Sequence, residues 1–265
     1  MGQQIDDGDD MLTTSYKEDK DCVAIVTGGS RGIGAAISKR LAKRGMVLNI
    51  LYERDARAAE QVAEMISSEE GKVTTHQVDV SSEAEVNSLV EDVIASAGGI
   101  DLLINNAAIS DDHLIMMTTL QEWERVLKVN ITGTFLMTRA VLPYMLDQGH
   151  GNIINISSNS ARIPGPGQAA YAASKGAVES FTRAVAMEVG RKGIRANTVA
   201  PGKIMTDMTR NLVDKLGAGT DGSRWGTPDD IAAVVSFLAS AEADYVQGQV
   251  ITVDGGRLVM RPHPR

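Results

Sequence analysis

One segment near the N-terminus runs Cys22-Val23-Ala24-Ile25-Val26-Thr27-Gly28-Gly29-Ser30-Arg31-Gly32-Ile33-Gly34. Its start is apolar and β-branched, which predicts a buried strand. The apolar residues that follow, between Ile33 and Arg44, recur at the spacing of a helix. Glycines between a strand and a helix allow a sharp turn and let a pyrophosphate approach the backbone and the helix N-terminus. We therefore expect a dinucleotide site here, with a glycine turn that holds no ligand as the alternative.

The rest of the chain alternates short apolar segments with longer helical patterns. Strands are predicted at 22–27, 46–51, 72–78, 102–105, 152–157, 195–199 and 249–253. Helices are predicted at 33–44, 56–67, 83–96, 120–146, 171–189 and 228–238. Strands that are apolar throughout are typical of sheets covered on both faces. The pattern predicts an α/β fold with a single Rossmann-type, doubly wound parallel sheet of about seven strands in the order 3-2-1-4-5-6-7 and helices on both faces.

The composition argues against a secreted, a membrane-spanning and a nucleic-acid-binding protein. Residues 1–20 are polar and acidic and lack the apolar centre of a secretory signal, so we expect a disordered tail before a single catalytic domain at 21–265. No apolar run approaches the length of a membrane span. The formal charge of -8 argues against nucleic acid as a partner. The single cysteine, Cys22, fits a reducing compartment, and we expect a cytoplasmic protein.

Tyr171 and Lys175 stand four residues apart in a predicted helix, so their side chains share one face. A free phenol, with a pKa near ~10, is a poor base at neutral pH. A nearby ammonium favours the phenolate and lowers that pKa, which predicts a proton donor and acceptor usable near neutral pH. The alternative is a pair of ordinary surface residues.

The end of the second predicted strand bears on the choice of nicotinamide cofactor. Sites for NAD usually place an acid there, but this chain has Tyr52. Arg31 and Arg54 would both hold a 2′-phosphate, although Glu53 would repel that phosphate or pair with an arginine. We expect NADPH rather than NADH. The alternative for each arginine is a solvated surface charge.

Seven motifs follow in order: Thr27-Gly28-(x)3-Gly32-Ile33-Gly34, Asp79-Val80, Asn105-Asn106-Ala107, Asn130, Ser158, Tyr171-(x)3-Lys175 and Pro201-Gly202. Over residues 20–258 this pattern resembles the short-chain dehydrogenase/reductase family, and it is most similar to the 3-oxoacyl-[acyl-carrier-protein] reductases. The resemblance implies an NAD(P)-dependent oxidoreductase. This chain departs from the family at Ala108, where glycine is usual, and the extra methyl crowds the cofactor side of the cleft.

The resemblance implies how the cofactor is bound. Asp79 would accept from the adenine amino group, with the Val80 N–H nearby, although Asp79 could instead cap the next helix. Lys175 would bind the nicotinamide ribose, and the Ile204 backbone would bind the carboxamide. With the two arginines, the expected cofactor residues are Gly28, Ser30, Arg31, Gly32, Ile33, Gly34, Arg54, Asp79, Val80, Asn106, Tyr171, Lys175, Ile204 and Thr206.

The resemblance also implies the catalytic residues. Ser158, thirteen residues before Tyr171, would polarise a substrate carbonyl, and Tyr171 would deliver the proton. Lys175 would lower the pKa of Tyr171. Asn130 would break its helix and hold a water linked to Lys175, although it could be a surface asparagine. Ser157 and Ser158 could be turn formers. No metal is expected, because the four histidines are scattered: His76, His113, His150 and His263.

The substrate is the least determined feature. The resemblance favours a 3-oxoacyl thioester of fatty acid or polyketide assembly, free or on a carrier protein. One alternative is a dehydrogenase for a small free alcohol, sugar or cyclic ketone, and another is a non-catalytic dinucleotide-binding regulator. Gly149 lacks the basic side chain that carrier-binding members have there, whereas Arg191 and Lys192 keep the second basic site. A glycine-rich substrate lid is expected near 203–226. Apolar residues around more than one face of 171–189, together with the resemblance, favour a homotetramer.

Overall fold

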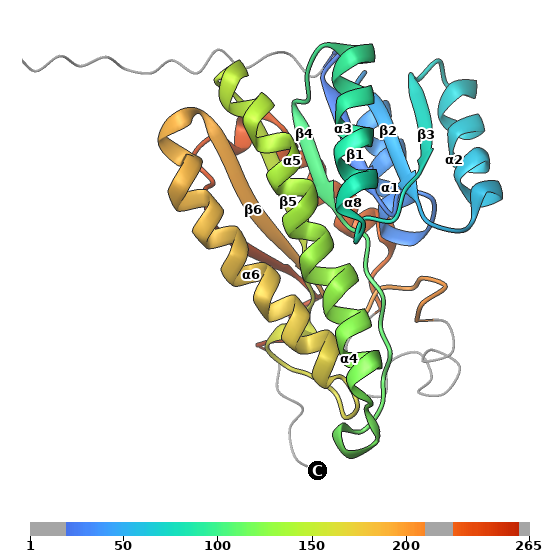
Figure 1. Ribbon diagram of the computed structural model, residues 1–265, viewed down its shortest axis with the longest axis vertical. Helices are drawn as coiled ribbons and strands as arrows, with labels where there is room; N and C mark the ends of the chain where they lie inside the picture. The colour runs from blue at the N-terminus through green and yellow to red at the C-terminus, as the bar shows by residue number, and fades with distance from the viewer. Residues whose placement is uncertain (1–19, 210–224, 260–265) are drawn as a thin grey trace, which may run out of the picture.

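The computed structural model describes residues 20–209 and 225–259. They form a seven-stranded sheet in the order β3-β2-β1-β4-β5-β6-β7, with all neighbours parallel, so the predicted fold class and strand order are confirmed (Figure 1). The strands are β1 Val23–Thr27, β2 Val47–Tyr52, β3 Val73–Gln77, β4 Leu102–Asn105, β5 Gly151–Ile156, β6 Ile194–Pro201 and β7 Val250–Val253. The longer helices are α1 Gly32–Ala42, α2 Ala56–Ser68, α3 Glu83–Ala97, α4 Leu120–Leu127, α5 Gly133–Gln148, α6 Ala169–Val189 and α8 Pro228–Ala239.

Two apolar cores lie on opposite faces of the sheet. Successive residues of a strand point to opposite faces. Ala24 and Val26 of β1 therefore pack with α1, α2 and α8, whereas Val23 and Ile25 pack with α3, α5 and α6. Figure 1 shows α3, α5 and α6 in front of the sheet, with α1 and α8 behind it. Burial on both faces explains why these strands are apolar throughout.

The strand order reverses between β1 and β4, and ligands of doubly wound sheets bind at this point, outside the carboxyl ends of the strands. Thr27 joins the two strand ends. Its hydroxyl donates to the Ile104 carbonyl at 3.3 Å and accepts from the backbone N–H groups of Asn106 and Ala107 at 2.9 Å each. These hydrogen bonds hold the ends of β1 and β4 together without a ligand, so this wall of the cleft is preformed.

A buried polar chain connects the sheet to the helices in front. Asn105 on β4 donates to Asn155 on β5 at 2.8 Å and to Thr138 on α5 at 3.2 Å. Asn155 donates in turn to Thr182 on α6 at 2.8 Å. Because buried polar groups without partners are costly, this network specifies how α5 and α6 sit on the two strands.

The predicted helix at 120–146 is wrong as a single element. Helix α4 ends at Leu127, a π-helical turn spans Lys128–Thr132, and α5 begins at Gly133. Asn130 lies in that turn, so the predicted break at this residue is confirmed. The break admits one extra residue per turn and redirects the chain between α4 and α5. The other predicted bounds differ from the structure by two residues at most.

Two predicted segments fall partly outside the described residues. Residues 1–19 of the expected tail and residues 210–224 of the expected lid are not described. The described ends of the lid segment pair with each other: Met205 N–H donates to the Gly226 carbonyl at 2.9 Å, and Gly226 N–H donates to the Lys203 carbonyl at 2.8 Å. The division into a tail and one catalytic domain stays a prediction.

Gly34→Ala is expected to lower the free energy of unfolding by roughly 2 kcal/mol, because overpacking a rigid site carries a cost of that order. A Cβ at Gly34 would lie 2.2 Å from the Gly28 carbonyl oxygen, which is backbone and cannot move aside. Urea unfolding measures the change. The matched control is Gly176→Ala in α6, where a Cβ meets nothing within 4 Å. The control should gain up to about 1 kcal/mol, and equal stability of the two variants would contradict the packing argument.

Candidate active site

A cleft of about 780 Å³ lies at the carboxyl edge of the sheet and brings together most of the predicted residues. Its lining joins the glycine turn to the ends of β2, β4, β5 and β6 and to the start of α6. The predicted residues that line it are Gly28, Ser30, Arg31, Gly32, Ile33, Arg54, Asp79, Val80, Asn106, Ser158, Tyr171, Lys175, Ile204 and Thr206. Gly34 and Asn130 do not line it, but each contacts residues that do.

The glycine turn has the shape that a pyrophosphate needs. Gly28 and Gly32 have φ of +61° and +51°, in the left-handed region that favours glycine. No side chain caps α1 at Arg31, so the N-terminus of the helix faces the cleft without a side-chain acceptor. Thr206 lies over the turn, with its Cγ2 atom 3.3 Å from where a Cβ of Gly32 would be. Thr206 therefore packs closely against the turn, beside the N-terminus of α1 that no side chain caps.

Asn106 holds the turn in place. Its side-chain amide donates to the carbonyl oxygens of Thr27 and Gly28 at 3.0 Å each. This contact is structural, whereas the sequence predicted Asn106 only as a cofactor residue. Gly34 is required for the same reason, because a Cβ there would also lie 2.6 Å from the Asn106 amide nitrogen.

At the adenosine end, acids and arginines pair with each other. Arg54 lies 2.8 Å from Glu53. Of the two alternatives for that acid, repulsion of a 2′-phosphate or pairing with an arginine, the structure has the pairing. Arg31 lies 4.0 Å from Asp55, which also caps α2 by accepting from the Ala58 N–H at 3.0 Å. Arg54 is thus engaged closely and Arg31 only weakly.

Asp79 does not cap α3. Its Oδ1 atom accepts from the Ser81 N–H at 2.8 Å, and Ser82 is the residue that caps the helix. The side chain of Asp79 is therefore held in a turn at the rim of the cleft, where it remains able to accept from an adenine amino group. The helix-cap alternative is wrong, because Ser82 supplies the oxygen.

One corner of the cleft, called here the catalytic corner, joins the three residues predicted to be catalytic: Ser158, Tyr171 and Lys175. The side chain of Ser158 hydrogen-bonds that of Tyr171. Lys175 is buried, donates to the Ile156 carbonyl at 2.7 Å, and holds its Nζ atom 5.7 Å from the centre of the Tyr171 ring. The three side chains come from the end of β5 and from two successive turns of α6, and all three line the cleft.

The pKa of Tyr171 differs from the sequence prediction. Burial raises it above the ordinary value, the hydrogen bond from Ser158 acts in the opposite direction, and the charge of Asp112 raises it further. Lys175 does not reverse this, because its own burial lowers its pKa to about 8 and it is uncharged at the pH where the phenol titrates. The expectation that Lys175 brings the phenol below its usual pKa is therefore wrong for the protein alone: burial of the phenol outweighs the hydrogen bond from Ser158.

Asn130 connects two segments beside this corner. Its amide accepts from the Ile109 N–H at 2.8 Å and donates to the Ile109 carbonyl at 2.9 Å. It also donates to Ser174 at 3.0 Å, and Ser174 donates to the Tyr171 carbonyl at 2.6 Å. The side chain is buried rather than on the surface. Asn130 thereby ties the loop after β4 to the helix that carries Tyr171.

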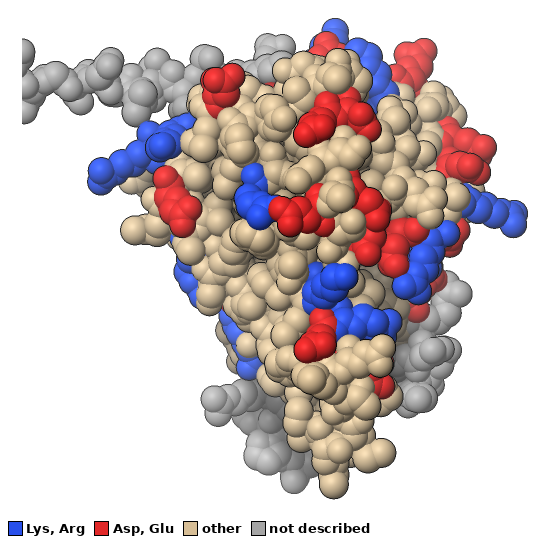
Figure 2. Space-filling view, viewed as in Figure 1, with Lys and Arg blue, Asp and Glu red and all other residues tan. Residues whose placement is uncertain are grey.

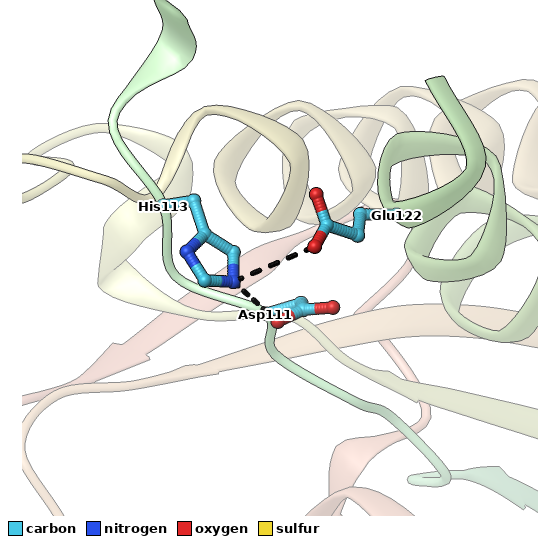
Figure 3. Close-up of side chains that lie close together, drawn as sticks. All are labelled: Asp111, His113 and Glu122. Atoms are coloured by element: carbon cyan, nitrogen blue, oxygen red, sulfur yellow. Dashed lines mark ion pairs between the residues drawn. The ribbon is translucent and has the colours of Figure 1, made fainter. Parts of the chain in front are cut away.

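A cluster that sequence spacing did not reveal lies on the loop after β4 (Figure 3). The Nε2 atom of His113 is 3.1 Å from Asp111 Oδ1 and 3.7 Å from Glu122 Oε1. The other oxygens are engaged, since Asp111 Oδ2 pairs with Arg125 at 2.5 Å and Glu122 Oε2 accepts from Thr119 at 2.8 Å. These ion pairs and the helix cap account for the arrangement, and we assign it a structural role at the start of α4.

Known proteins resemble this chain over almost its whole length. A family model described as short chain dehydrogenase matches residues 22–217. The 3-oxoacyl-[acyl-carrier-protein] reductase of Synechocystis sp. is 40% identical over 239 residues, which span 89% of this chain and 97% of that protein. A structure described as an NAD(P) dependent gluconate 5-dehydrogenase from Beutenbergia cavernae, with bound NADP at low occupancy, has a TM-score of 0.85 and 33% identity over 92% of this chain and 100% of its own. Levodione reductase has a TM-score of 0.86 and 34% identity over 91% of this chain and 99% of its own.

Lys175→Met is expected to raise the free energy of unfolding at pH 7, measured by urea without dinucleotide. A lysine whose pKa falls from 10.5 to about 8 on folding is destabilising below pH 8, and this cost disappears as the pH rises toward 10.5. The advantage of the variant should therefore shrink by roughly 2 kcal/mol between pH 7 and pH 10.

The control for this comparison is Lys72→Met. Lys72 is exposed and pairs with Asp21 at 2.7 Å, so its replacement should show no comparable dependence on pH. An advantage of Lys175→Met that is the same at pH 7 and pH 10 would contradict a lowered pKa for the buried lysine.

Proposed function

The chain belongs to the short chain dehydrogenase family and is an NAD(P)-dependent oxidoreductase, and from this premise we propose that it is an NADPH-dependent reductase of a 3-oxoacyl thioester. The observation that carries the proposal is the hydrogen bond between the side chains of Ser158 and Tyr171, next to the buried Lys175. Two hydroxyl groups that converge at one point in a cleft suit a carbonyl oxygen that becomes negative during reduction.

Each residue of the corner has a task in the proposed reaction. When bound, the reduced nicotinamide supplies the hydride. The hydroxyls of Ser158 and Tyr171 donate to the carbonyl oxygen and stabilise its growing charge, and Tyr171 transfers its proton to that oxygen. A phenol with a raised pKa holds its proton at neutral pH and is ready to act as the acid. Lys175 binds the nicotinamide ribose, and Asn130 holds a water that links Lys175 to solvent.

The preference for NADPH is assigned mainly to Arg31. The ion pair of Arg54 with Glu53 at 2.8 Å competes with a 2′-phosphate, whereas Arg31 sits at 4.0 Å from its nearest acid. Tyr52 ends β2 without the carboxylate that would bind a ribose 2′-OH. The Beutenbergia structure with bound NADP is consistent with this choice.

A thioester is favoured by the 40% identity to 3-oxoacyl-[acyl-carrier-protein] reductases and by the surface beside the cleft. Figure 2 shows few charged side chains at the lower end of the molecule, below α4. Exposed apolar residues before α4 and at its first position would suit an acyl chain better than a sugar: Leu114, Ile115, Met116, Met117 and Leu120. A carrier protein would find basic residues at Arg191 and Lys192 but none at Gly149. The second candidate, a dehydrogenase of a small sugar, alcohol or cyclic ketone, is favoured by the likeness to gluconate 5-dehydrogenase and levodione reductase.

We also propose a homotetramer in the cytoplasm. One face of α6 is buried within the subunit, and the opposite face exposes Met187, which is 86% accessible. A symmetric partner would cover that face, and light scattering would measure the assembly. None of the described helices is long and apolar enough to cross a membrane.

A panel of carbonyl compounds tests the reaction and its substrate, with NADPH oxidation as the measurement. An acetoacetyl thioester should be reduced with a kcat/KM at least about tenfold above free ketones and sugar acids, because the acyl end adds binding energy. Tyr171→Phe should lower kcat by roughly a hundredfold or more, as loss of a general acid does, with NADPH affinity kept. Tyr144→Phe in α5, away from the cleft, is the control.

The outcomes of the panel separate the candidates. Reduction of free ketones or sugars without reduction of the thioester would favour the second candidate. No turnover of any carbonyl compound, with NADPH still bound, would support the non-catalytic regulator instead.

Arg31→Ala should reduce kcat/KM for NADPH by about tenfold to a hundredfold, because a hydrogen bond to a charged group is worth roughly 1.5–3 kcal/mol. The value for NADH should change by less than about threefold. Arg54→Ala should have a smaller effect, since Glu53 already engages that side chain. Arg40→Ala, on the exposed side of α1, is the control. Equal losses with both cofactors would contradict the role of Arg31.

A further inference from the structure

Glu179 is a buried carboxylate that the proposed reaction does not use. It lies on α6, one turn after Lys175, and its side chain is 8% exposed. A buried charge is costly unless it has partners, so the partners of Glu179 show what holds it there.

The two oxygens of Glu179 reach the two ends of the segment that carries Ser158. Oε1 accepts from the Ser157 hydroxyl at 3.2 Å, and Oε2 accepts from Arg162 Nη2 at 3.2 Å. Ser158 lies between these two attachments, at the start of a 3-10 turn over Asn159–Ala161. One carboxylate of α6 therefore spans the whole segment from the end of β5 to Arg162.

The conformation of this segment determines where the Ser158 hydroxyl lies. The Ser160 N–H donates to Ser158 Oγ at 3.1 Å, so a shift of the turn moves the oxygen. Arg162 also donates to Thr252 on β7 at 2.7 Å, so this end of the segment is attached to the sheet as well as to α6.

We propose that Glu179 is a positioning residue for the reduction, which holds Ser157 and Arg162 and thereby keeps the Ser158 hydroxyl against Tyr171. The inference rests on the proposed function of Ser158 and Tyr171. What it adds is that Glu179, which does not line the cleft, fixes the position of the Ser158 hydroxyl, which does.

The segment has a second anchor, which lets the chain fold without Glu179. Asn159 donates to Asp254 at 2.7 Å. The Ser157 oxygen also lies 3.1 Å from the Lys175 carbonyl, so its one proton goes to that carbonyl when Glu179 is replaced. Loss of Glu179 should therefore loosen Ser158 rather than unfold the protein. Since displacement of a catalytic group by about 1 Å can cost up to a hundredfold in rate, a local change suffices to be measured.

The test uses Glu179→Met in the full chain. The methionine side chain has a similar length but no oxygen, so it can accept neither from Ser157 nor from Arg162. We expect kcat to fall by roughly tenfold or more, with the NADPH Kd within about twofold and the far-UV spectrum unchanged. Arg162→Met should cause a similar loss, and the double variant should be no worse than the more damaged single variant, because the pair acts as a unit.

The control is Glu83→Gln, which breaks the exposed pair of Glu83 with Arg139 between α3 and α5. It should leave kcat unchanged. A kcat for Glu179→Met within twofold of the parent would overturn the proposal, as would a loss of activity that merely follows the fraction of unfolded protein.

The ionisation of Tyr171 gives a readout that a purely structural role would not move. The Ser158 hydrogen bond opposes the rise in the pKa of Tyr171, and the charge of Asp112 adds to that rise. Lys175 lies 5.7 Å from the ring, but with a pKa of about 8 it is uncharged where the phenol titrates. Loosening Ser158 should raise that pKa further. Phenolate absorbance near 295 nm, taken as the difference between each protein and its Tyr171→Phe form, reports it with or without turnover. If the parent reduces no carbonyl compound, the proposed function fails. The positioning role is then tested separately, and an unchanged phenol titration in Glu179→Met would overturn it.

Discussion

The site depends on one buried contact, the hydrogen bond from the Lys175 ammonium to the Ile156 carbonyl at 2.7 Å. It joins α6 to the last residue of β5, so Tyr171 and Ser158 are brought together from both sides of the contact. Burial of this lysine lowers the stability of the fold. Loss of water around the ammonium lowers the pKa of Lys175 to about 8, so the charged form is disfavoured in the folded protein. Catalytic groups are often held at such expense to stability.

The surroundings of this contact are polar, although the sheet itself is apolar. Thr27, Asn106 and Asn130 each connect segments that are far apart in the chain, and Glu179 spans the segment around Ser158. The apolar cores determine that the sheet forms and which helices cover it, but they are not directional. Hydrogen bonds are directional, and they give the turn, the loop after β4 and the catalytic corner their relative positions.

Family membership and substrate depend on different parts of the molecule. The turn, the strand ends and the catalytic corner match those expected of the family, and similar proteins are described both as thioester reductases and as sugar dehydrogenases. We therefore expect the substrate to be selected by loops rather than by the shared fold. In this chain the loop after β4 exposes an apolar segment at 114–117, and the charge of Asp112 acts on the phenol. Function is carried by such additions to a shared fold.

The sequence by itself determined the strand order and the glycine turn, because periodicity and motif spacing are local properties of the chain. The family resemblance supplied most of the other residues that converge in the cleft, and the break at Asn130. The tertiary structure alone decided that α4 and α5 are separate, that Arg54 pairs with Glu53, that Ser82 rather than Asp79 caps α3, and that Glu179 spans Ser157 and Arg162. It also reversed the expected shift of the Tyr171 pKa. Each of these depends on distances between separate segments or on how much water a group loses, and neither quantity can be read from the order of residues.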